Sequence, residues 1–266
     1  MAAPVWNRFR AVFQHFGHNS LKATRRRSRL DISIADAAVY VVGDVHGCLH
    51  ELLTLEKIIY SDARRLMGKK IIVMLGDYID KGPASAQVLE HLMSPCKGGF
   101  ERICLTGNHD MAMVDYFDRK LALSTWIQIG GDATLDSYGI DIAHLKKIYP
   151  KAKHLDQYIR NNLPVHHIDF LRSMPIVVKA DNFVFVHAGV RPAIPFQDQR
   201  DEDFVFIRED FFNETRLLKY WVIHGHTPVV TPDRQGRRLN IDTGAYYTGK
   251  LTALRIWKRT GTILGT

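Results

Sequence analysis

Residues 39–47 read Val-Tyr-Val-Val-Gly-Asp-Val-His-Gly, an apolar, β-branched run that ends in an acidic residue and a histidine between two glycines. Four further apolar runs end in a similar way. The five polar blocks are Gly43-Asp44-Val45-His46-Gly47, Gly76-Asp77-Tyr78-Ile79-Asp80-Lys81-Gly82, Gly107-Asn108-His109-Asp110, His187-Ala188-Gly189 and His224-Gly225-His226-Thr227. In open α/β sheets, functional side chains lie at the carboxyl ends of strands, where loops from distant segments meet. The series therefore predicts an α/β fold with one site built at strand ends.

Strands and helices alternate along the chain from residue 38 onward. Strands are predicted at 39–42, 71–75 and 103–105, and helices at 49–65, 83–93 and 111–119. Residues 120–173 are predicted to be mostly helical, with a loop at Gly130 and Gly131. The last third returns to strands, at 176–179, 183–186, 221–223, 239–241 and 251–257. We expect one catalytic domain over residues 38–266 and a separate tail over residues 1–37.

The composition is that of an ordinary globular protein, with 266 residues of which 46% are hydrophobic. Its three cysteines contain no CxxC pair and are odd in number, so neither a disulfide framework nor a zinc ribbon is predicted. No apolar stretch approaches the roughly 18 residues that cross a bilayer, and the N-terminus lacks the apolar core of a secretory signal. We expect a soluble, cytoplasmic protein.

The net charge of +8 is concentrated in the tail. Residues 1–30 contain seven basic residues and no acidic residue, so the remainder of the chain carries only +1. A basic groove over the catalytic body, such as a nuclease needs, is therefore not implied, and we expect no nucleic-acid partner.

The tail has an amphipathic pattern. Val5, Trp6, Phe9, Phe13 and Phe16 fall on one face of a helix, and a basic cluster follows at residues 25–29. This pattern suits contact of residues 1–30 with an anionic membrane surface or with a partner. Docking on the protein's own body, or fraying in solution, ranks ahead of the membrane interpretation.

The blocks supply ligands for two adjacent divalent cations. Asp44 and His46 alternate across one residue, so an extended segment points both towards one ion. Asp77 can bridge to a second ion, for which Asn108 offers a carbonyl oxygen and two histidines offer imidazoles, namely His187 and His226. This mixed oxygen and nitrogen set without thiolate suits manganese, iron or zinc better than calcium.

The charge of such a centre indicates its chemistry. Two divalent ions and two ligating carboxylates, Asp44 and Asp77, leave a net positive charge that attracts a phosphate group. Paired ions can also hold the attacking oxygen and the substrate oxygen of an in-line displacement. We therefore expect phosphoester hydrolysis with metal-bound hydroxide as the nucleophile. His109 directly follows a predicted ligand and suits a general acid, which Asp80 could orient.

These blocks resemble those of the calcineurin-like metallophosphoesterases, in the phosphoprotein phosphatase branch, close to bacterial members and to symmetrical diadenosine tetraphosphate hydrolases. The resemblance covers residues 38–258. It implies two packed mixed β-sheets flanked by helices. It also implies that Asp44, His46 and Asp77 bind the first metal, that Asp77, Asn108, His187 and His226 bind the second, that His109 and Asp80 form the acid pair, and that Arg208 clamps phosphate.

Two residues depart from the pattern of that family. Lys81 stands where an arginine is usual, so the positive charge is kept but the planar fork that grips two phosphate oxygens is lost. Asp110 stands where glutamate is usual, a milder change because that residue is not a ligand. Pro228 occupies the position of an additional histidine ligand in related phosphodiesterases, which favours the phosphatase branch.

The expected activity is therefore that of a phosphomonoester hydrolase with two divalent ions, most readily Mn²⁺. A serine/threonine protein phosphatase, acting on a phosphorylated protein, is the leading hypothesis. A symmetrical dinucleoside polyphosphate hydrolase, acting on a small phosphoester, is the alternative, with residues 120–173 forming the wall that would distinguish the two. A non-catalytic metal-binding adaptor is disfavoured because every predicted ligand and the acid pair are present.

Overall fold

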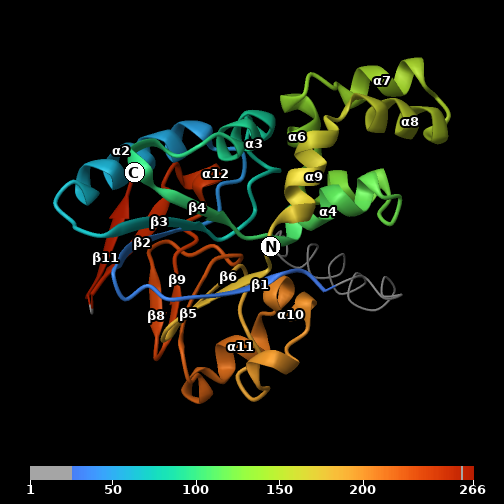
Figure 1. Cartoon of the computed structure of the whole chain (residues 1–266). Helices are drawn as coiled ribbons and strands as arrows, with labels where there is room; N and C mark the ends of the chain where they lie inside the picture. Colours follow the sequence, from blue (N-terminus) through green and yellow to red (C-terminus); the bar gives the residue numbers. More distant parts are fainter. Residues whose placement is uncertain (1–25, 259) are drawn as a thin grey trace.

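The computed structural model describes residues 26–258 and 260–266, and these form two β-sheets stacked face to face with helices outside (Figure 1). In the five-stranded sheet the order is β11-β10-β2-β3-β4. Its parallel strands are β2 (Ala37–Val42), β3 (Lys69–Met74) and β4 (Glu101–Cys104). The antiparallel strands β10 (Thr252–Trp257) and β11 (Thr260–Gly265) complete one edge.

The six-stranded sheet has the order β1-β5-β6-β7-β9-β8. It contains β1 (Arg29–Ile32), β5 (Val177–Ala180), β6 (Phe183–Val186), β7 (Trp221–His224), β8 (Asp233–Gln235) and β9 (Arg238–Asn240). β6, β7 and β9 run parallel to one another. Both sheets therefore have a parallel centre whose strand ends face the same site.

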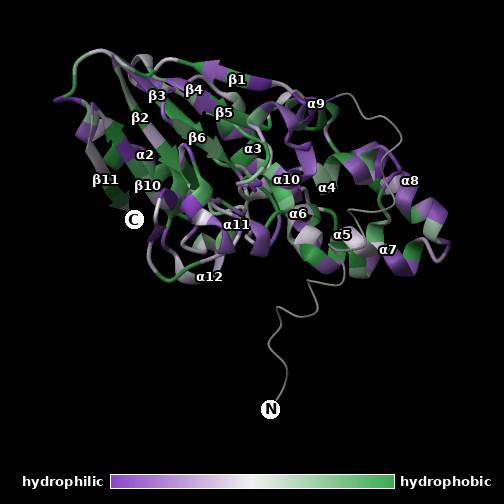
Figure 2. Cartoon of the chain, turned by 90° about the horizontal axis from the view of Figure 1, so that it is seen from below, coloured by the Kyte–Doolittle hydropathy of each residue, from purple (hydrophilic) through white to green (hydrophobic). Residues whose placement is uncertain are grey.

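The alternation of side chains along β2 explains the layers. Val39 and Val41 pack against the six-stranded sheet, where they meet Phe185 and Ile223. Tyr40 and Val42 point the other way and pack under the helices. Every residue of β2 is buried because both faces of its sheet are covered, and the strands are correspondingly rich in hydrophobic residues in Figure 2.

Helices cover the outer face of each sheet. The five-stranded sheet is covered by α2 (Leu49–Ala63), α3 (Ser85–Met93) and α4 (Asn108–Phe117), and the six-stranded sheet by α10 (Asp201–Phe206) and α11 (Glu209–Asn213). This is the predicted arrangement of two mixed sheets flanked by helices.

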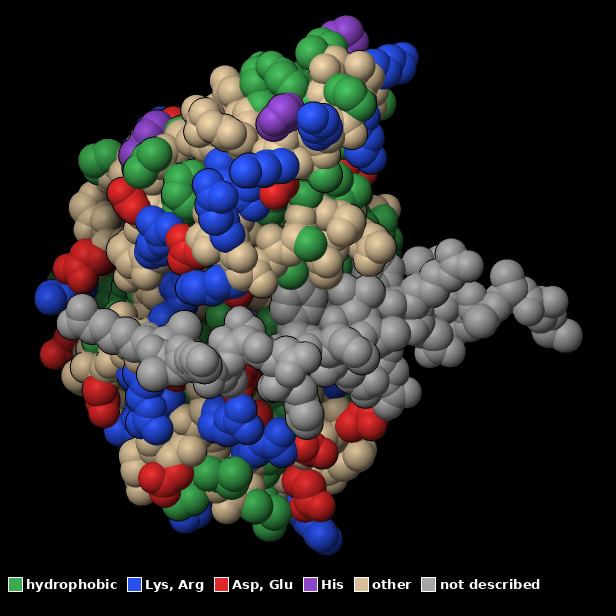
Figure 3. Space-filling model, turned by 90° about the vertical axis from the view of Figure 1, so that its right-hand side faces the viewer, with side chains coloured by type: hydrophobic (Ala, Val, Ile, Leu, Met, Phe, Trp, Pro, Cys, Tyr) green, Lys and Arg blue, Asp and Glu red, His purple; other side chains and the backbone are tan. Residues whose placement is uncertain are grey.

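A helical segment follows α4 and projects from the sheets (Figure 1). It comprises α5 (Leu123–Trp126), a π-helical turn (Ile127–Gly131), α6 (Asp132–Ser137), α7 (Ile142–Ile148), α8 (Ala152–Asn162) and α9 (Val165–Ser173). Gly130 and Gly131, predicted as a loop, lie within the π-helical turn, but Gly130 interrupts it as a kink with non-helical φ of 110° and ψ of 11°. Lysine, arginine and histidine side chains lie on the projecting part in Figure 3, and α7, α8 and their connection include four exposed lysines, Lys146, Lys147, Lys151 and Lys153.

The folded body begins before residue 38. Residues 29–32, which the sequence pattern assigned to the tail, form β1 and pair in parallel with β5. The Arg27 guanidinium donates hydrogen bonds to the carbonyls of Leu171 and Met174, and Arg29 forms an ion pair with Asp201 at 2.8 Å. These two arginines of the basic cluster therefore bind the protein itself. The amphipathic pattern at residues 5–16 lies outside the described residues.

No helix in residues 26–258 or 260–266 combines the length and the apolar character needed to cross a membrane.

Candidate metal centre

Five loops bring the predicted ligands together where the two sheets meet. Asp44 and His46 follow β2, Asp77 follows β3, and Asn108 begins α4 just after β4. The histidine ligands follow β6 and β7, at positions 187 and 226. Backbone hydrogen bonds join neighbouring loops, since His46 N donates to Asp77 O at 2.8 Å and Gly225 N donates to His187 O at 2.8 Å.

Asp77 lies at the middle of the arrangement. Its Oδ2 atom is 3.5 Å from His46 Nε2 and 3.5 Å from His187 Nε2. Two groups of described residues that could each hold a metal ion share this carboxylate, His46 with Asp77 and His109, and Asp77 with His187 and His226. The geometry is that of a bridging carboxylate between two cation positions.

Asn108 adjoins the two histidines of the second group, and these three side chains have the donor spacing of a metal site. Asn108 Oδ1 lies 2.9 Å from His187 Nε2 and 2.8 Å from His226 Nδ1, and the two imidazole nitrogens are 3.2 Å apart. A tetrahedral site with bonds of 2.0–2.1 Å has ligand atoms about 3.3 Å apart. The three donors therefore need little movement to share one ion.

The protonation of His187 indicates why a cation fits there. Its Nδ1 atom donates to the Leu75 carbonyl at 3.1 Å, and burial lowers its pKa to about 3, so Nε2 carries a lone pair at neutral pH. Asn108 Oδ1 is also an acceptor and faces this lone pair at 2.9 Å. A shared cation converts this repulsion between acceptors into attraction.

Asp44 is outside both groups but adjoins them. Its Oδ2 atom accepts from His226 N at 3.0 Å, while Oδ1 is buried and has no hydrogen-bond partner among the described residues. An unpaired buried carboxylate oxygen is costly and suits a missing ligand bond. Gly225 permits the close approach, because a Cβ atom there would lie 2.0 Å from Asp44 Oδ1.

Backbone strain is concentrated at the site. Eight non-glycine residues in the described ranges have positive φ, and five of them are predicted site residues, His46, Asp77, Asp80, Lys81 and His226. Such conformations cost of order 1–3 kcal/mol each and persist only where the surrounding structure enforces them. The fold therefore holds these side chains in positions that local preference alone would not give.

The centre carries an excess of buried negative charge. Its carboxylates are Asp44, Asp77, Asp80, Asp110 and Asp242, all of them buried. Burial raises the pKa of Asp77 to about 7 and that of Asp242 to about 6, because the charged form loses its hydration. Bound divalent cations would compensate these charges, so the residues present fit a dinuclear metal centre.

His109 and Asp80, the pair predicted to act as general acid, are in hydrogen-bond contact. His109 Nδ1 donates to Asp80 Oδ2 at 2.8 Å, and both side chains are buried. Asp80 is also held by Trp126 Nε1 at 3.2 Å and by the Thr134 hydroxyl at 2.6 Å. Burial, followed by the charge of Lys81, lowers the pKa of His109 and favours its neutral form, so the acid role depends on the Asp80 carboxylate to hold the ring protonated.

Comparison with known proteins identifies the family. Residues 37–261 match the profile of the calcineurin-like phosphoesterases. The chain belongs to the calcineurin-like phosphoesterase family. It is therefore a metal-dependent phosphoester hydrolase.

Curated relatives and solved structures agree with this family. A bis(5'-nucleosyl)-tetraphosphatase PrpE [asymmetrical] of Bacillus thuringiensis is 28% identical over 234 residues, which cover 81% of this chain and 89% of that protein. The protein of the same name from Bacillus cereus gives the same identity and coverage. A solved structure described as "a putative diadenosine tetraphosphatase" matches with a TM-score of 0.62 and 18% identity over 90% of this chain and 98% of that one. A serine/threonine phosphatase from Saccharomyces cerevisiae matches with a TM-score of 0.52 and 14% identity over 97% and 89% of the two chains.

The two predicted phosphate-binding residues both reach the metallophosphoesterase centre. Lys81 Nζ lies 3.0 Å from His46 Nε2 and 4.9 Å from the centre of the Tyr246 ring. Arg208 is half-buried at the start of α11. Burial lowers its pKa, while the charges of Asp77 and Asp242 act in the opposite direction.

The structure adds residues whose roles the sequence did not reveal. Asp110 accepts hydrogen bonds from the backbone N–H groups of Asp77, Tyr78 and Gly107, at 2.8, 3.0 and 2.8 Å. The carboxylate usual at this position in the family was the available signal. Trp126 and Thr134, which hold Asp80, come from the helical segment and belong to no motif, so no local signal pointed to them.

His224 does not join the metal ligands. Its Nε2 atom faces Arg238 Nη1 at 3.2 Å, and its Nδ1 atom donates to the Gly225 carbonyl at 3.0 Å. It therefore supports the backbone that presents His226.

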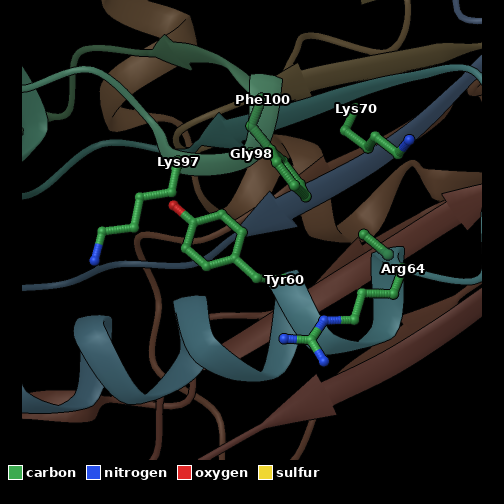
Figure 4. A pocket seen from close by; sticks show the side chains of 7 residues that line it. Tyr60, Arg64, Lys70, Lys97, Gly98 and Phe100 are labelled. Carbon is green, nitrogen blue, oxygen red and sulfur yellow. The ribbon is translucent and has the colours of Figure 1, made fainter.

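The cavity of about 390 Å³ in Figure 4 lies elsewhere and contains none of the predicted site residues. It is lined by Tyr60, Ala63, Arg64, Lys70, Lys97, Gly98 and Phe100. The ammonium groups of Lys70 and Lys97 point in opposite directions in the figure, so they do not converge on one anion.

Proposed function

We propose that the protein hydrolyses phosphoesters with a pair of divalent cations, using His109 as general acid and Lys81 and Arg208 to bind phosphate. The observation that carries this proposal is the position of Asp77, 3.5 Å from one imidazole of each ligand group, with the His109–Asp80 pair beside it. Asp44 and His46 would complete the first cation position, and Asn108, His187 and His226 the second.

The cations, when bound, supply Lewis acidity and an activated water. Oxygen and imidazole donors without thiolate favour Mn²⁺, with iron and zinc as the other metals that suit the set. The free cysteines Cys48, Cys96 and Cys104 are consistent with a reducing compartment such as the cytoplasm.

The chain's own residues would handle the leaving group. His109 would give its Nε2 proton to the departing oxygen while Nδ1 stays bonded to Asp80. Because Asp80 is held by Trp126 and Thr134, the imidazole keeps one orientation throughout the reaction. General acid catalysis of this kind contributes typically 10²- to 10⁴-fold.

Lys81 and Arg208 would bind the non-bridging phosphate oxygens. When His46 Nε2 binds a cation, its lone pair is no longer available to the Lys81 ammonium, which then faces the substrate. A lysine binds phosphate as a point charge, whereas the arginine at position 208 offers two parallel donors.

Among phosphoesters, dinucleoside polyphosphates are the favoured substrate class. Tyr246 and Tyr247 are exposed and form an edge-to-face pair with ring centres 4.9 Å apart. Tyr246 also lies 5.5 Å from the His46 ring, so the pair borders the metal centre. An exposed aromatic pair suits stacking of a nucleobase, and the names of the curated relatives point to the same class. Phosphoserine or phosphothreonine in proteins is the second candidate, supported by the fold shared with the yeast phosphatase.

The test compares diadenosine tetraphosphate, a phosphoserine peptide and an aryl phosphate with Mn²⁺ and purified protein. We expect the dinucleotide to have the highest kcat/KM, and product analysis separates symmetrical cleavage into two ADP from asymmetrical cleavage into ATP and AMP. Tyr246→Leu should raise KM for the dinucleotide and leave the aryl phosphate unaffected. A phosphopeptide preference unchanged by Tyr246→Leu would favour the protein phosphatase. Retention of wild-type activity by Asp77→Asn would overturn the two-cation chemistry.

A further inference from the structure

A further cluster of side chains that could hold a metal ion lies between α3 and α9, away from the metallophosphoesterase centre. Glu90 of α3 and the neighbouring His166 and His167 of α9 each offer a ligand atom close to the other two. His166 Nε2 is 3.2 Å from Glu90 Oε1, and His167 Nε2 is 2.9 Å from the same oxygen. None of these residues contributes to the catalytic centre.

We propose that Glu90, His166 and His167 form a zinc-type divalent-cation site that joins α3 to α9. Two imidazole nitrogens and one carboxylate oxygen are a common protein ligand set for zinc, with a fourth position left to water. The donor spacings of 2.9 and 3.2 Å are close to the edge of about 3.3 Å in a tetrahedral zinc site. Glu90 and His166 are 62% and 57% exposed, so a cation can reach them from solvent.

His167 is oriented as a metal ligand requires. Its side chain is only 2% exposed, and its Nδ1 atom lies 2.6 Å from the hydroxyl of Tyr138, which follows α6. With the proton on Nδ1 donated to the Tyr138 oxygen, Nε2 presents a lone pair towards Glu90. A hydrogen bond to the non-ligating nitrogen is the usual device that fixes the tautomer of a metal-binding histidine. Burial also lowers the pKa of His167, so fewer His167 rings carry a second proton that must leave when a cation binds.

The alternative is a cluster of hydrogen bonds alone. In that case both histidines hold a proton on Nε2, both donate to Glu90, and His167 Nδ1 accepts from Tyr138. The two arrangements differ in the number of bound cations, which can be measured directly.

The position of the cluster links it to the acid pair. Ser85, at the start of α3, receives a hydrogen bond from Asp80 N, and Thr134 of α6 bonds to the Asp80 carboxylate. α3 packs against both α6 and α9. A cation shared by α3 and α9 would therefore fasten the helical segment that holds Asp80 in place.

The test is equilibrium dialysis of the purified full-length protein against Zn²⁺, followed by metal analysis. We expect three ions per chain for wild type and two for His166→Ala and for Glu90→Gln. His154→Ala removes another exposed histidine, on α8, and should keep three. Co²⁺ in place of zinc should give a visible absorption of which one part, that of the third ion, is lost in the His166→Ala variant.

Equal zinc content in wild type and His166→Ala would overturn the proposal, as would an equal loss in His154→Ala. Asp77→Asn separates this site from the proposed function, because it should lower binding at the catalytic centre and leave the Co²⁺ signal that depends on His166. Two ions in every protein, together with full wild-type activity, would reject the additional site and leave the hydrolase intact.

Discussion

Replacing Asp110 with asparagine should destabilise the protein and weaken metal binding, although Asp110 is not a predicted ligand. Its carboxylate accepts hydrogen bonds from the backbone N–H groups of Gly107, Asp77 and Tyr78. Asparagine has the same shape but only one acceptor oxygen. Its NH₂ group must therefore face at least one of these buried donors.

The size of the effect follows from these three bonds. A buried donor left unpaired costs about 1–3 kcal/mol, and exchanging a charged acceptor for a neutral one weakens each remaining bond by about 0.5–1 kcal/mol. The sum is about 3 kcal/mol. In a chain of this size each kcal/mol lowers the melting temperature by roughly 2–4 °C, so we expect a fall of about 6–12 °C. Because Asp110 holds the loop that presents Asp77, Mn²⁺ affinity should fall about 10- to 100-fold.

Thermal unfolding followed by circular dichroism, with and without Mn²⁺, measures the first effect, and calorimetric titration with Mn²⁺ measures the second. Asp110→Glu is the matched control, because it keeps the carboxylate and introduces the residue usual in the family. It should retain more stability and more metal affinity than Asp110→Asn. A melting temperature within about 2 °C of wild type and unchanged Mn²⁺ affinity in Asp110→Asn would refute the proposal that Asp110 holds the loop that presents Asp77.

Three further substitutions test other parts of the protein. His109→Asn should reduce kcat on alkyl phosphates by about 10²- to 10⁴-fold and on aryl phosphates far less, because aryl leaving groups scarcely need a proton; equal losses would exclude the acid role. Lys81→Arg should lower the inhibition constant of inorganic phosphate, and an unchanged constant would mean that this side chain points elsewhere. Glu56→Gln should cost about 1.5–3 kcal/mol without changing kcat, because the buried Arg102 guanidinium loses its carboxylate partner and keeps only its hydrogen bonds to backbone carbonyls. Burial raises the pKa of Glu56, but His91 and Arg102 outweigh it and hold that pKa below 4.5, so the stabilisation is present above pH 4.5 and lost as pH falls through the lowered pKa. Urea unfolding of wild type and Glu56→Gln should therefore differ at pH 7 and converge in acid.

The sequence by itself determined the central strands and the residues that follow them. A buried strand needs a continuous apolar run, and a catalytic loop needs glycine and polar residues directly after it, so both signals are local. This is why the sequence alone places β2, β3 and the blocks at Asp44, Asp77 and Asn108. The sequence pattern assigns the short strand β1 to the tail because Arg29–Ile32 adjoins the basic cluster and is only four residues long, although its alternation of polar and apolar residues suits a half-buried strand; its pairing with β5 decides the matter.

Only the tertiary structure decided what surrounds those ligands. Trp126 and Thr134 bond to Asp80 across 46 and 54 residues of sequence, and Glu90 meets His166 across 76. Such contacts leave no periodicity in the chain, because each depends on how separate elements pack and not on the conformation of a single segment. A ligand that directly follows a strand can be predicted from the local sequence. The residue that orients this ligand can come from any element that packing brings within hydrogen-bond distance.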